Sequence, residues 1–156
     1  QVLEHRHHVG GFVGIDQRAN GGIDQPVLEA IGHTYEVQAA LKTPDGTKKP
    51  DYVFYRDNAA RAGLKGKTLD DELLKTTAFA VGDAKYWDRP LDIAIKTGAD
   101  PFNNKNPSYQ IAFYVQHSGV AWGILTNGRL WRLYHKDTAH KLDRYYEVDL
   151  PSVVAS

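Results

Sequence analysis

The sequence predicts an α/β domain in which helices flank a mixed β-sheet. Its 156 residues suit a single domain with a sizeable core. Helical and strand-like patterns alternate along the chain, which begins with a helix and ends with strands. One segment, TAFAVGD (residues 77–83), is almost continuously apolar, as is typical of a strand at the centre of a sheet.

The first predicted element is a short helix over residues 26–31. Asp24 is a candidate N-cap, Pro26 suits an early helical position, and Gly32 ends the pattern. The preceding residues, 1–25, are polar and rich in glycine, and their pattern defines no structure.

A strand hairpin follows this helix. Polar and apolar residues alternate through TYEVQAALKT (34–43), the period expected of a strand. Residues 44–49 have the composition of a turn, and DYVFYR (51–56) is expected to be the partner strand.

The middle of the chain predicts a loop, a helix and the central strand. Residues 58–67 are polar and contain glycines, which favours a loop. TLDDELLKT (68–76) is a helix candidate because Thr68 can cap it and leucines recur along one face. The apolar strand 77–83 comes next.

The second half predicts a long irregular segment, a helix and more strands. Residues 88–107 have no regular pattern. The segment that follows reads as a helix, with Ser108 as its cap and Gly119 as its end. An Asn-Gly dipeptide inside residues 120–135 indicates a hairpin, and residues 144–150 a last strand.

The composition narrows the class of protein. There is no cysteine, so disulfides and thiolate metal sites are excluded, and we expect a cytoplasmic protein. No apolar run approaches the roughly 18 residues of a membrane span, so no membrane partner is expected. The 19 basic and 19 acidic residues balance, so any nucleic acid would have to be held by local positive charge or by another domain.

The chain is also expected to be part of a longer polypeptide, because it starts at Gln1 and contains no methionine. We expect an N-terminal segment over residues 1–25, a single domain over residues 26–150, and the start of a linker over residues 151–156.

Two charged residues at the end of the apolar strand indicate a candidate catalytic site there. Asp83 and Lys85 are two apart, so their side chains point to the same side. Asp51 opens a predicted neighbouring strand after Pro50. Two carboxylates and the backbone carbonyl of Ala84 are oxygen ligands suited to Mg²⁺, and the lysine beside them could orient an attacking water or balance charge on a phosphate. The alternative is a surface ion pair at a strand end.

These motifs resemble those of a known family. Pro50-Asp51 followed by Asp83-Ala84-Lys85 is similar to the signature of the PD-(D/E)xK nucleases. Gln110 and Tyr114 resemble the Q-x-x-x-Y motif of RecB-like nucleases and of type I restriction-enzyme R subunits. Two further segments resemble the nuclease domains of these enzymes and of single-chain type IIG-like restriction-modification enzymes, namely PVLEAIGHTYEVQ (26–38) and GILTNGRLWRLY (123–134).

The resemblance implies a restriction-endonuclease-like core over residues 26–150 and a Mg²⁺-dependent DNA endonuclease domain of a restriction-modification enzyme, with Mn²⁺ as a substitute ion. It implies that Asp51 and Asp83 hold the metal, that Lys85 is catalytic and that Gln110 supports the site. Implied partners are double-stranded DNA, methyltransferase and target-recognition regions, and a second copy met transiently on DNA. The alternatives are a repair or recombination nuclease of the same fold and an inactive DNA-binding module.

Several further residues have both a functional and a structural interpretation. Tyr114 could border the site or pack its helix, and Arg89 could contact a DNA phosphate or lie on a solvated rim. Either Glu29 or Glu4 could supply the glutamate that the family carries on its first helix, although a solvated helix face is the alternative for Glu29. Trp87 could stack on a base or anchor its loop.

One departure from the family pattern concerns the carboxylate before x-Lys. It is usually a glutamate, whereas this chain has Asp83, which is one methylene shorter.

Overall fold

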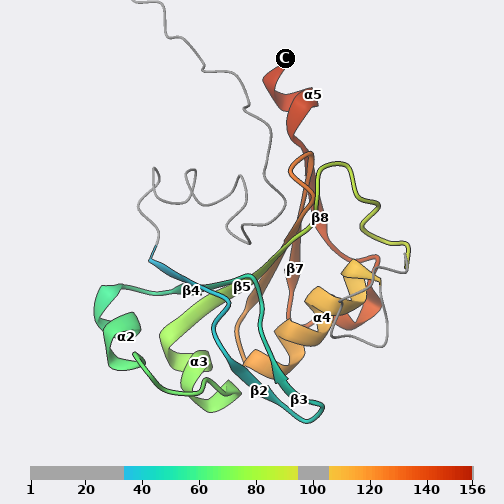
Figure 1. Cartoon of the computed structure of the whole chain (residues 1–156). Coiled ribbons are helices and arrows are strands. Elements are labelled where there is room, and N and C mark those ends of the chain that lie inside the picture. The colour runs from blue at the N-terminus through green and yellow to red at the C-terminus, as the bar shows by residue number, and fades with distance from the viewer. Residues whose placement is uncertain (1–33, 95–105, 156) are drawn as a thin grey trace, which may run out of the picture.

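A mixed sheet of six strands organises the chain, whose computed structural model describes residues 34–94 and 106–155 (Figure 1). The predicted α/β class, with helices against a mixed sheet, is confirmed. In spatial order the strands are β1 (Tyr35–Val37), β4 (Tyr52–Tyr55), β5 (Ala78–Ala84), β6 (Trp122–Thr126), β7 (Leu130–His135) and β8 (Tyr146–Asp149).

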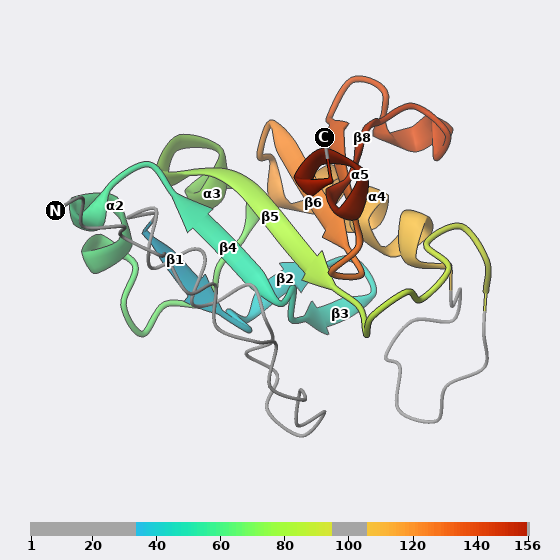
Figure 2. The ribbon, with the colours of Figure 1, turned by 90° about the horizontal axis from the view of Figure 1, so that it is seen from above.

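The pairing of the strands changes from antiparallel to parallel at the centre of the sheet. β1, β4 and β5 pair antiparallel, and β4 and β5 lie side by side in Figure 2. β5 and β6 pair parallel, which requires a crossover connection. That connection contains helix α4 (Pro107–Ser118), which packs against both strands and ends, as predicted, at Gly119 with a left-handed φ of 68°. The hairpin of β6 and β7 around Asn127-Gly128, and the last strand β8, are confirmed.

The expected single strand over residues 34–43 is instead two strands. Gln38 has a left-handed φ of 51°, which breaks the extended chain between β1 and β2 (Leu41–Thr43). β2 pairs with β3 (Gly46–Lys48) in a separate two-stranded sheet, where a turn was predicted. β1 pairs with β4, so the predicted hairpin partner is correct for the first part of the segment only.

The predicted loop over residues 58–67 is wrong in its first half, which forms helix α2 (Asn58–Gly63). Asp57 caps this helix, since its Oδ1 accepts a hydrogen bond of 2.7 Å from the backbone N–H of Ala60. The helix buries none of its residues, so the sequence has no apolar stripe from which the helix could be predicted.

Two predicted helices are confirmed, but each begins at a different cap. Helix α3 (Asp71–Thr77) is capped by Asp70 instead of Thr68, and α4 is capped by Asn106 instead of Ser108. The carboxylate and the amide oxygen accept bonds from backbone N–H groups of the first turns.

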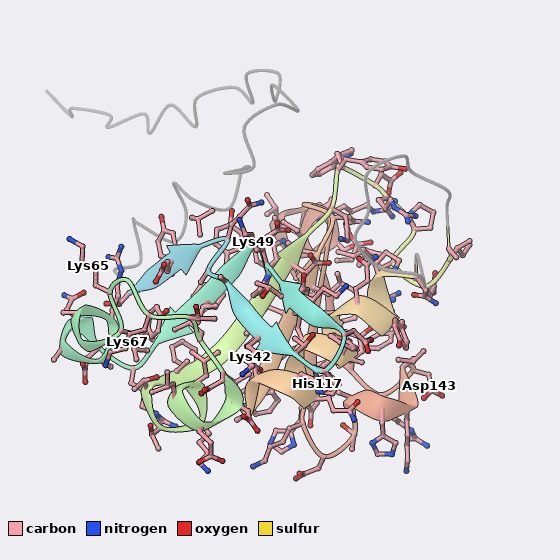
Figure 3. The ribbon with its side chains drawn as sticks, turned by 60° about the horizontal axis from the view of Figure 1, so that its bottom comes forward. Lys42, Lys49, Lys65, Lys67, His117 and Asp143 are labelled. Atoms are coloured by element: carbon pink, nitrogen blue, oxygen red, sulfur yellow. The ribbon has the colours of Figure 1, made fainter. Side chains whose placement is uncertain are left out.

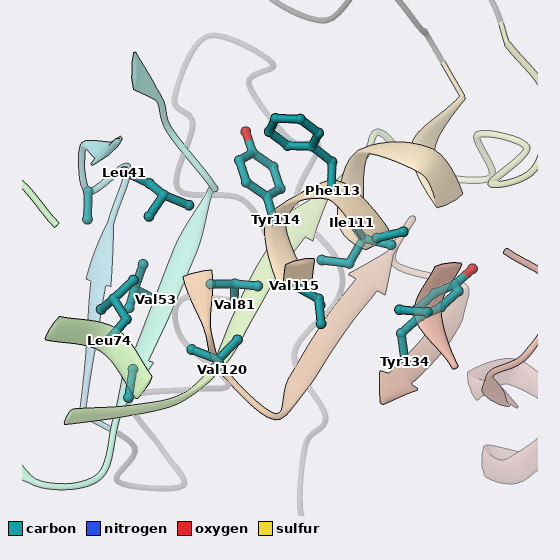
Figure 4. Close-up of a cluster of buried hydrophobic side chains, with 14 of the residues drawn as sticks. Leu41, Val53, Leu74, Val81, Ile111, Phe113, Tyr114, Val115, Val120 and Tyr134 are labelled. Carbon is teal, nitrogen blue, oxygen red and sulfur yellow. The ribbon is translucent and has the colours of Figure 1, made fainter. Parts of the chain in front are cut away.

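The main core lies between the sheet and the helices α3 and α4, and Figure 4 shows its side chains meeting from strands and helix. Fully buried members from five elements are Val53, Leu74, Val81, Ile111, Val115 and Tyr134. A smaller cluster covers the other face of the sheet, where Tyr52 and Phe54 stack with ring centroids 6.0 Å apart.

β5 carries one extra residue. Phe54 pairs with Ala80 and Tyr55 with Ala78, so Phe79 has no partner across the ladder and forms a bulge. Ala78 and Val81 contribute to the main core, whereas Phe79 and Ala80 both belong to the smaller cluster.

A 3-10 turn, Ala139–Lys141, separates β7 from β8, and a short helix, α5 (Leu150–Val154), follows β8 where the start of a linker was expected. Among the described helices, none has the length and apolar character needed to cross a membrane. The helix predicted over residues 26–31 lies outside the described residues.

Candidate active site at the end of β5

The ladder between β4 and β5 brings two carboxylates together. Tyr52 pairs with Gly82, so Asp51, one residue before β4, stands opposite Asp83. Val53 and Val81 pair two positions further on and face the main core, and the alternation of side chains gives the two aspartates the same side as these valines. The predicted meeting of Asp51 and Asp83 is therefore confirmed.

Hydrogen bonds and an ion pair hold Asp51, Asp83 and Lys85 in position. The backbone N–H of Ala84 donates to Oδ2 of Asp51 over 2.7 Å. Asp83 is only 6% exposed, and its Oδ2, which is shielded from solvent, lies 2.7 Å from Nζ of Lys85. The backbone N–H of Lys85 donates to the carbonyl of Thr126 over 2.7 Å, which ties the end of β5 to β6.

The raised pKa of Asp51 reflects its burial close to the carboxylate of Asp83. Burial is the largest cause that raises the pKa of Asp51, to about 7, and the negative charge of Asp83 adds to the rise. The N–H of Ala84 and the charge of Lys85 act in the opposite direction, and a hydrogen bond between the two side chains raises the pKa further. Two partly or fully buried carboxylates therefore face a single ammonium group.

A divalent cation fits this arrangement. Mg²⁺ prefers hard oxygen ligands and usually combines one or two carboxylates with water and substrate phosphate. Asp51 and Asp83 offer that set, and their mutual repulsion is what a cation would relieve. The peptide of Ala84 lies at the site, since its N–H contacts Asp51. Over residues 34–94 and 106–155 there is no cluster of three or more acidic, histidine or cysteine side chains arranged to hold a metal.

Gln110 and Tyr114 lie on α4, on the side of the sheet to which the aspartates point. Both are 2% exposed. Tyr114 belongs to the main core, packs against Phe113 and is seen there in Figure 4, so its packing role is confirmed. Gln110 is one helical turn closer to the start of α4, and its support of the site stays a prediction.

Arg89 is buried and Trp87 is exposed, which rules out one of the two interpretations of each residue. Arg89 is 4% exposed, and its Nη1 donates to the carbonyls of Pro90 and Ile93, both at 3.2 Å, so the prediction of a solvated rim is wrong. Trp87 is 49% exposed, so it does not anchor its loop in the core. Glu4 and Glu29 lie outside the described residues.

Asn127 has a role at the site that its Asn-Gly signal did not reveal. It is buried, and its Oδ1 accepts the backbone N–H groups of Arg129 and Leu130 within the turn. Its Nδ2 donates to the carbonyl of Arg89 over 2.8 Å. The same side chain therefore shapes the hairpin and holds the loop that follows Lys85, a tertiary contact that a local turn motif does not predict.

Comparison of the chain with family models, with curated proteins and with solved structures finds no match in any of the three. What the protein does is therefore inferred from its own residues and from the geometry of the site.

Proposed function

We propose that the chain is the Mg²⁺-dependent DNA endonuclease domain of a restriction-modification enzyme, with a restriction-endonuclease-like PD-(D/E)xK core. One observation carries the proposal: Asp51 and Asp83 meet across two paired strands, with the ammonium group of Lys85 2.7 Å from Asp83. A surface ion pair, the alternative from sequence, does not account for a second carboxylate that is buried beside the first.

Each residue then has a distinct task. Asp51 and Asp83 hold the cation, and the peptide of Ala84 keeps Asp51 in position. A bound Mg²⁺ supplies positive charge that stabilises a phosphate as negative charge builds up on it, and it lowers the pKa of water at the site. Lys85 balances the remaining charge and donates hydrogen bonds to the attacking water or to the phosphate.

The reaction is hydrolysis of a phosphodiester bond. The water oxygen forms a bond to phosphorus in line with the bond from phosphorus to the 3′ oxygen, and that second bond breaks. The attacking water gives up a proton to solvent, and the leaving 3′ oxygen takes one up. The products are a 5′-phosphate and a 3′-hydroxyl. In this proposal Gln110, buried at the start of α4, positions the site from the helix side.

The even charge balance fits a cleavage module whose DNA contacts are local. Lys49, two residues before Asp51, is exposed, as are Lys42, Lys65 and Lys67, which Figure 3 labels on one view of the molecule. Such lysines offer sequence-independent contacts to phosphates. Methyltransferase and target-recognition regions would supply sequence recognition, and a second copy met on DNA would cut the other strand.

Nicking of supercoiled plasmid in Mg²⁺ tests the proposal. We expect Asp83→Asn and Lys85→Met each to reduce the rate by at least about a hundredfold, a typical effect of removing a group that stabilises the transition state. Asp45→Asn, which changes an exposed turn carboxylate, is the matched control and should cut like the parent.

Circular dichroism and urea unfolding establish that each variant is folded. If folded Asp83→Asn and Lys85→Met nick the plasmid as fast as the parent, the assignment of the site is wrong. If no version of the chain nicks the plasmid although Mn²⁺ binds between the aspartates, the inactive-module alternative is correct.

A further inference from the structure

Two large aromatic side chains are exposed directly after Lys85. Tyr86 is 51% exposed and Trp87 is 49% exposed, and we call them the aromatic pair. Most large aromatic side chains of the described sheet and helices lie in the two cores. The aromatic pair instead leaves apolar surface in contact with water within two residues of the proposed catalytic lysine, an arrangement that is typical of a binding surface.

The backbone on both sides of the aromatic pair is pinned to the β6–β7 hairpin. Before it, the N–H of Lys85 donates to the carbonyl of Thr126 over 2.7 Å. After it, the N–H of Asp88 donates to the carbonyl of Asn127 over 3.2 Å, and Nδ2 of Asn127 donates to the carbonyl of Arg89. The exposure of the two rings therefore follows from a fixed backbone.

Arg89 supports one of the rings from within the protein. Its guanidinium group is buried, and its Cζ lies 5.9 Å from the centroid of the Tyr86 ring, within the range of a cation–π contact. Asp88, between the aromatic pair and Arg89, has a left-handed φ of 59°, and its carboxylate pairs with Arg129 at 3.2 Å. A strained non-glycine residue held by such contacts is often found where a loop has a binding role.

We infer that the aromatic pair stacks on a nucleobase beside the scissile phosphate, so that the substrate taken by this site has an unpaired base at the cut. This inference rests on the proposed function. Every base has an aromatic face, and stacking on Trp or Tyr is tolerant of sequence. Two residues of chain span at most about 7 Å, so the stacked base belongs to a nucleotide at or next to the phosphate that Lys85 contacts.

Duplex DNA does not offer this face freely. Its bases are covered by their neighbours, and exposing one costs a few kcal/mol unless it is already mismatched or single-stranded. The aromatic pair therefore favours single-stranded or locally opened DNA over a continuous duplex. In a larger enzyme, such an opening would have to be produced by the regions that bind the DNA.

Quenching of tryptophan fluorescence tests the inference without any cleavage. The probe is a short single-stranded oligodeoxythymidylate, added to the chain in buffer without divalent metal. We expect it to quench the emission of the parent, and we expect Trp87→Phe to abolish that quenching while it keeps the affinity. Trp87→Ala should weaken binding by about tenfold, the lower part of the range for loss of one stacked base.

The affinities are measured by the fluorescence anisotropy of a labelled oligonucleotide. Tyr146→Ala is the control. Tyr146 is also an exposed aromatic residue, but it lies at the end of β8 that is far from Arg129, so this variant should bind like the parent. A duplex of mixed sequence should bind more weakly than the same sequence as a single strand. A mismatch in that duplex should recover part of the difference.

The outcomes separate this inference from the proposed function. Quenching that depends on Trp87, without any nicking of plasmid, supports the stacking surface and shows that the proposed nuclease function is wrong. Nicking with no quenching, or with Trp87→Ala binding the oligonucleotide like the parent, overturns the stacking surface alone. An aromatic pair that responds to no oligonucleotide also overturns it.

Discussion

The backbone N–H of Ala84, at the end of β5, donates a hydrogen bond of 2.7 Å to the carboxylate of Asp51, which precedes β4. This bond joins the two halves of the candidate site through the main chain. It holds Asp51 beside Asp83 although the two carboxylates repel each other and burial disfavours the charge of Asp51. This bond is additional to the ladder between β4 and β5, and its acceptor is the side chain of Asp51, so substitutions of Asp83 and Lys85 test the chemistry of the site without removing either partner of the bond.

The first prediction concerns the dependence of stability on pH. The pKa of Asp51 rises from an ordinary value of 3.8 to about 7 on folding, so between these values the folded chain binds more protons than the unfolded chain. The contribution of Asp51 to the free energy of unfolding therefore falls as pH rises through this window. Asp51→Asn removes the penalty and should stabilise the chain at pH 8 by on the order of 2 kcal/mol.

Urea unfolding of the parent and of Asp51→Asn at pH 5 and pH 8 measures this difference, and subtraction of the two profiles removes the histidines and other groups that titrate in both. At pH 5, which lies inside the window between 3.8 and about 7, the gain from Asp51→Asn should be only about a third of its value at pH 8. A gain from Asp51→Asn that is the same at both pH values would show that Asp51 is not buried beside a like charge.

The second prediction concerns metal binding by the folded chain. Mn²⁺ or Mg²⁺ should raise the thermal unfolding midpoint at pH 8, because a ligand at a hundred times its Kd stabilises the folded state by about 2.7 kcal/mol. The effect should weaken as pH falls below 7, where protons compete for Asp51. Asp83→Asn should lose the effect, whereas Asp45→Asn should keep it. Stabilisation that Asp83→Asn retains in full would place the ion elsewhere.

The third prediction concerns the close approach of α4 to β6. A Cβ atom at Gly123 would lie 2.9 Å from Ile111 Cγ1, and even closer to Val115 Cγ2. Gly123→Ala should therefore destabilise the chain by about 1–3 kcal/mol through overpacking. Gly63→Ala is the control, since nothing lies within 4 Å of its Cβ position in α2. It should be neutral or slightly stabilising. Equal unfolding midpoints in urea for the two variants would contradict this packing.

The fourth prediction concerns the anchor of the loop that follows Lys85. Asn127→Ala removes three hydrogen bonds of a buried side chain and leaves the N–H groups of Arg129 and Leu130 without their acceptor. We expect a loss of about 2–4 kcal/mol in the free energy of unfolding. Asn58→Ala, at an exposed helix start, should change it by less than about 0.5 kcal/mol.

Hydrogen exchange provides a second measurement on Asn127→Ala. The amides of Lys85 and Asp88, which donate to the hairpin, should exchange faster in this variant than in the parent. Unchanged exchange at these two amides would show that Asn127 does not hold the loop.

The elements that could be predicted from the sequence are those whose local signals agree with their tertiary setting. β5 is apolar and central, α4 has a glycine end, and Asn127-Gly128 forms the expected turn. The break at Gln38 could not be predicted, because the alternation of side chains continues through it and only the pairing with two different partners separates the strands.

The candidate site was predictable in its centre and not at its edge. The period of a strand places Asp83 and Lys85 together, and the contact of 2.7 Å between them confirms this. Arg89 and Trp87 follow the opposite of their usual tendencies, since the arginine is buried and the tryptophan exposed. Their environments depend on Asn127 and the hairpin, which lie about 40 residues further along the chain.

The bulge at Phe79 determines to which side of the sheet Asp83, near the end of β5, points. Ala78 and Val81 are three residues apart and yet face the same side of the sheet. In a regular strand, side chains three residues apart face opposite sides, so the inserted residue Phe79 is needed for this arrangement. Without it, the side chain of Asp83 would emerge on the side of Tyr52 and Phe54, away from α4 and from Asp51. The orientation of the acidic pair is therefore encoded four residues upstream of Asp83, at a position that takes no part in the chemistry.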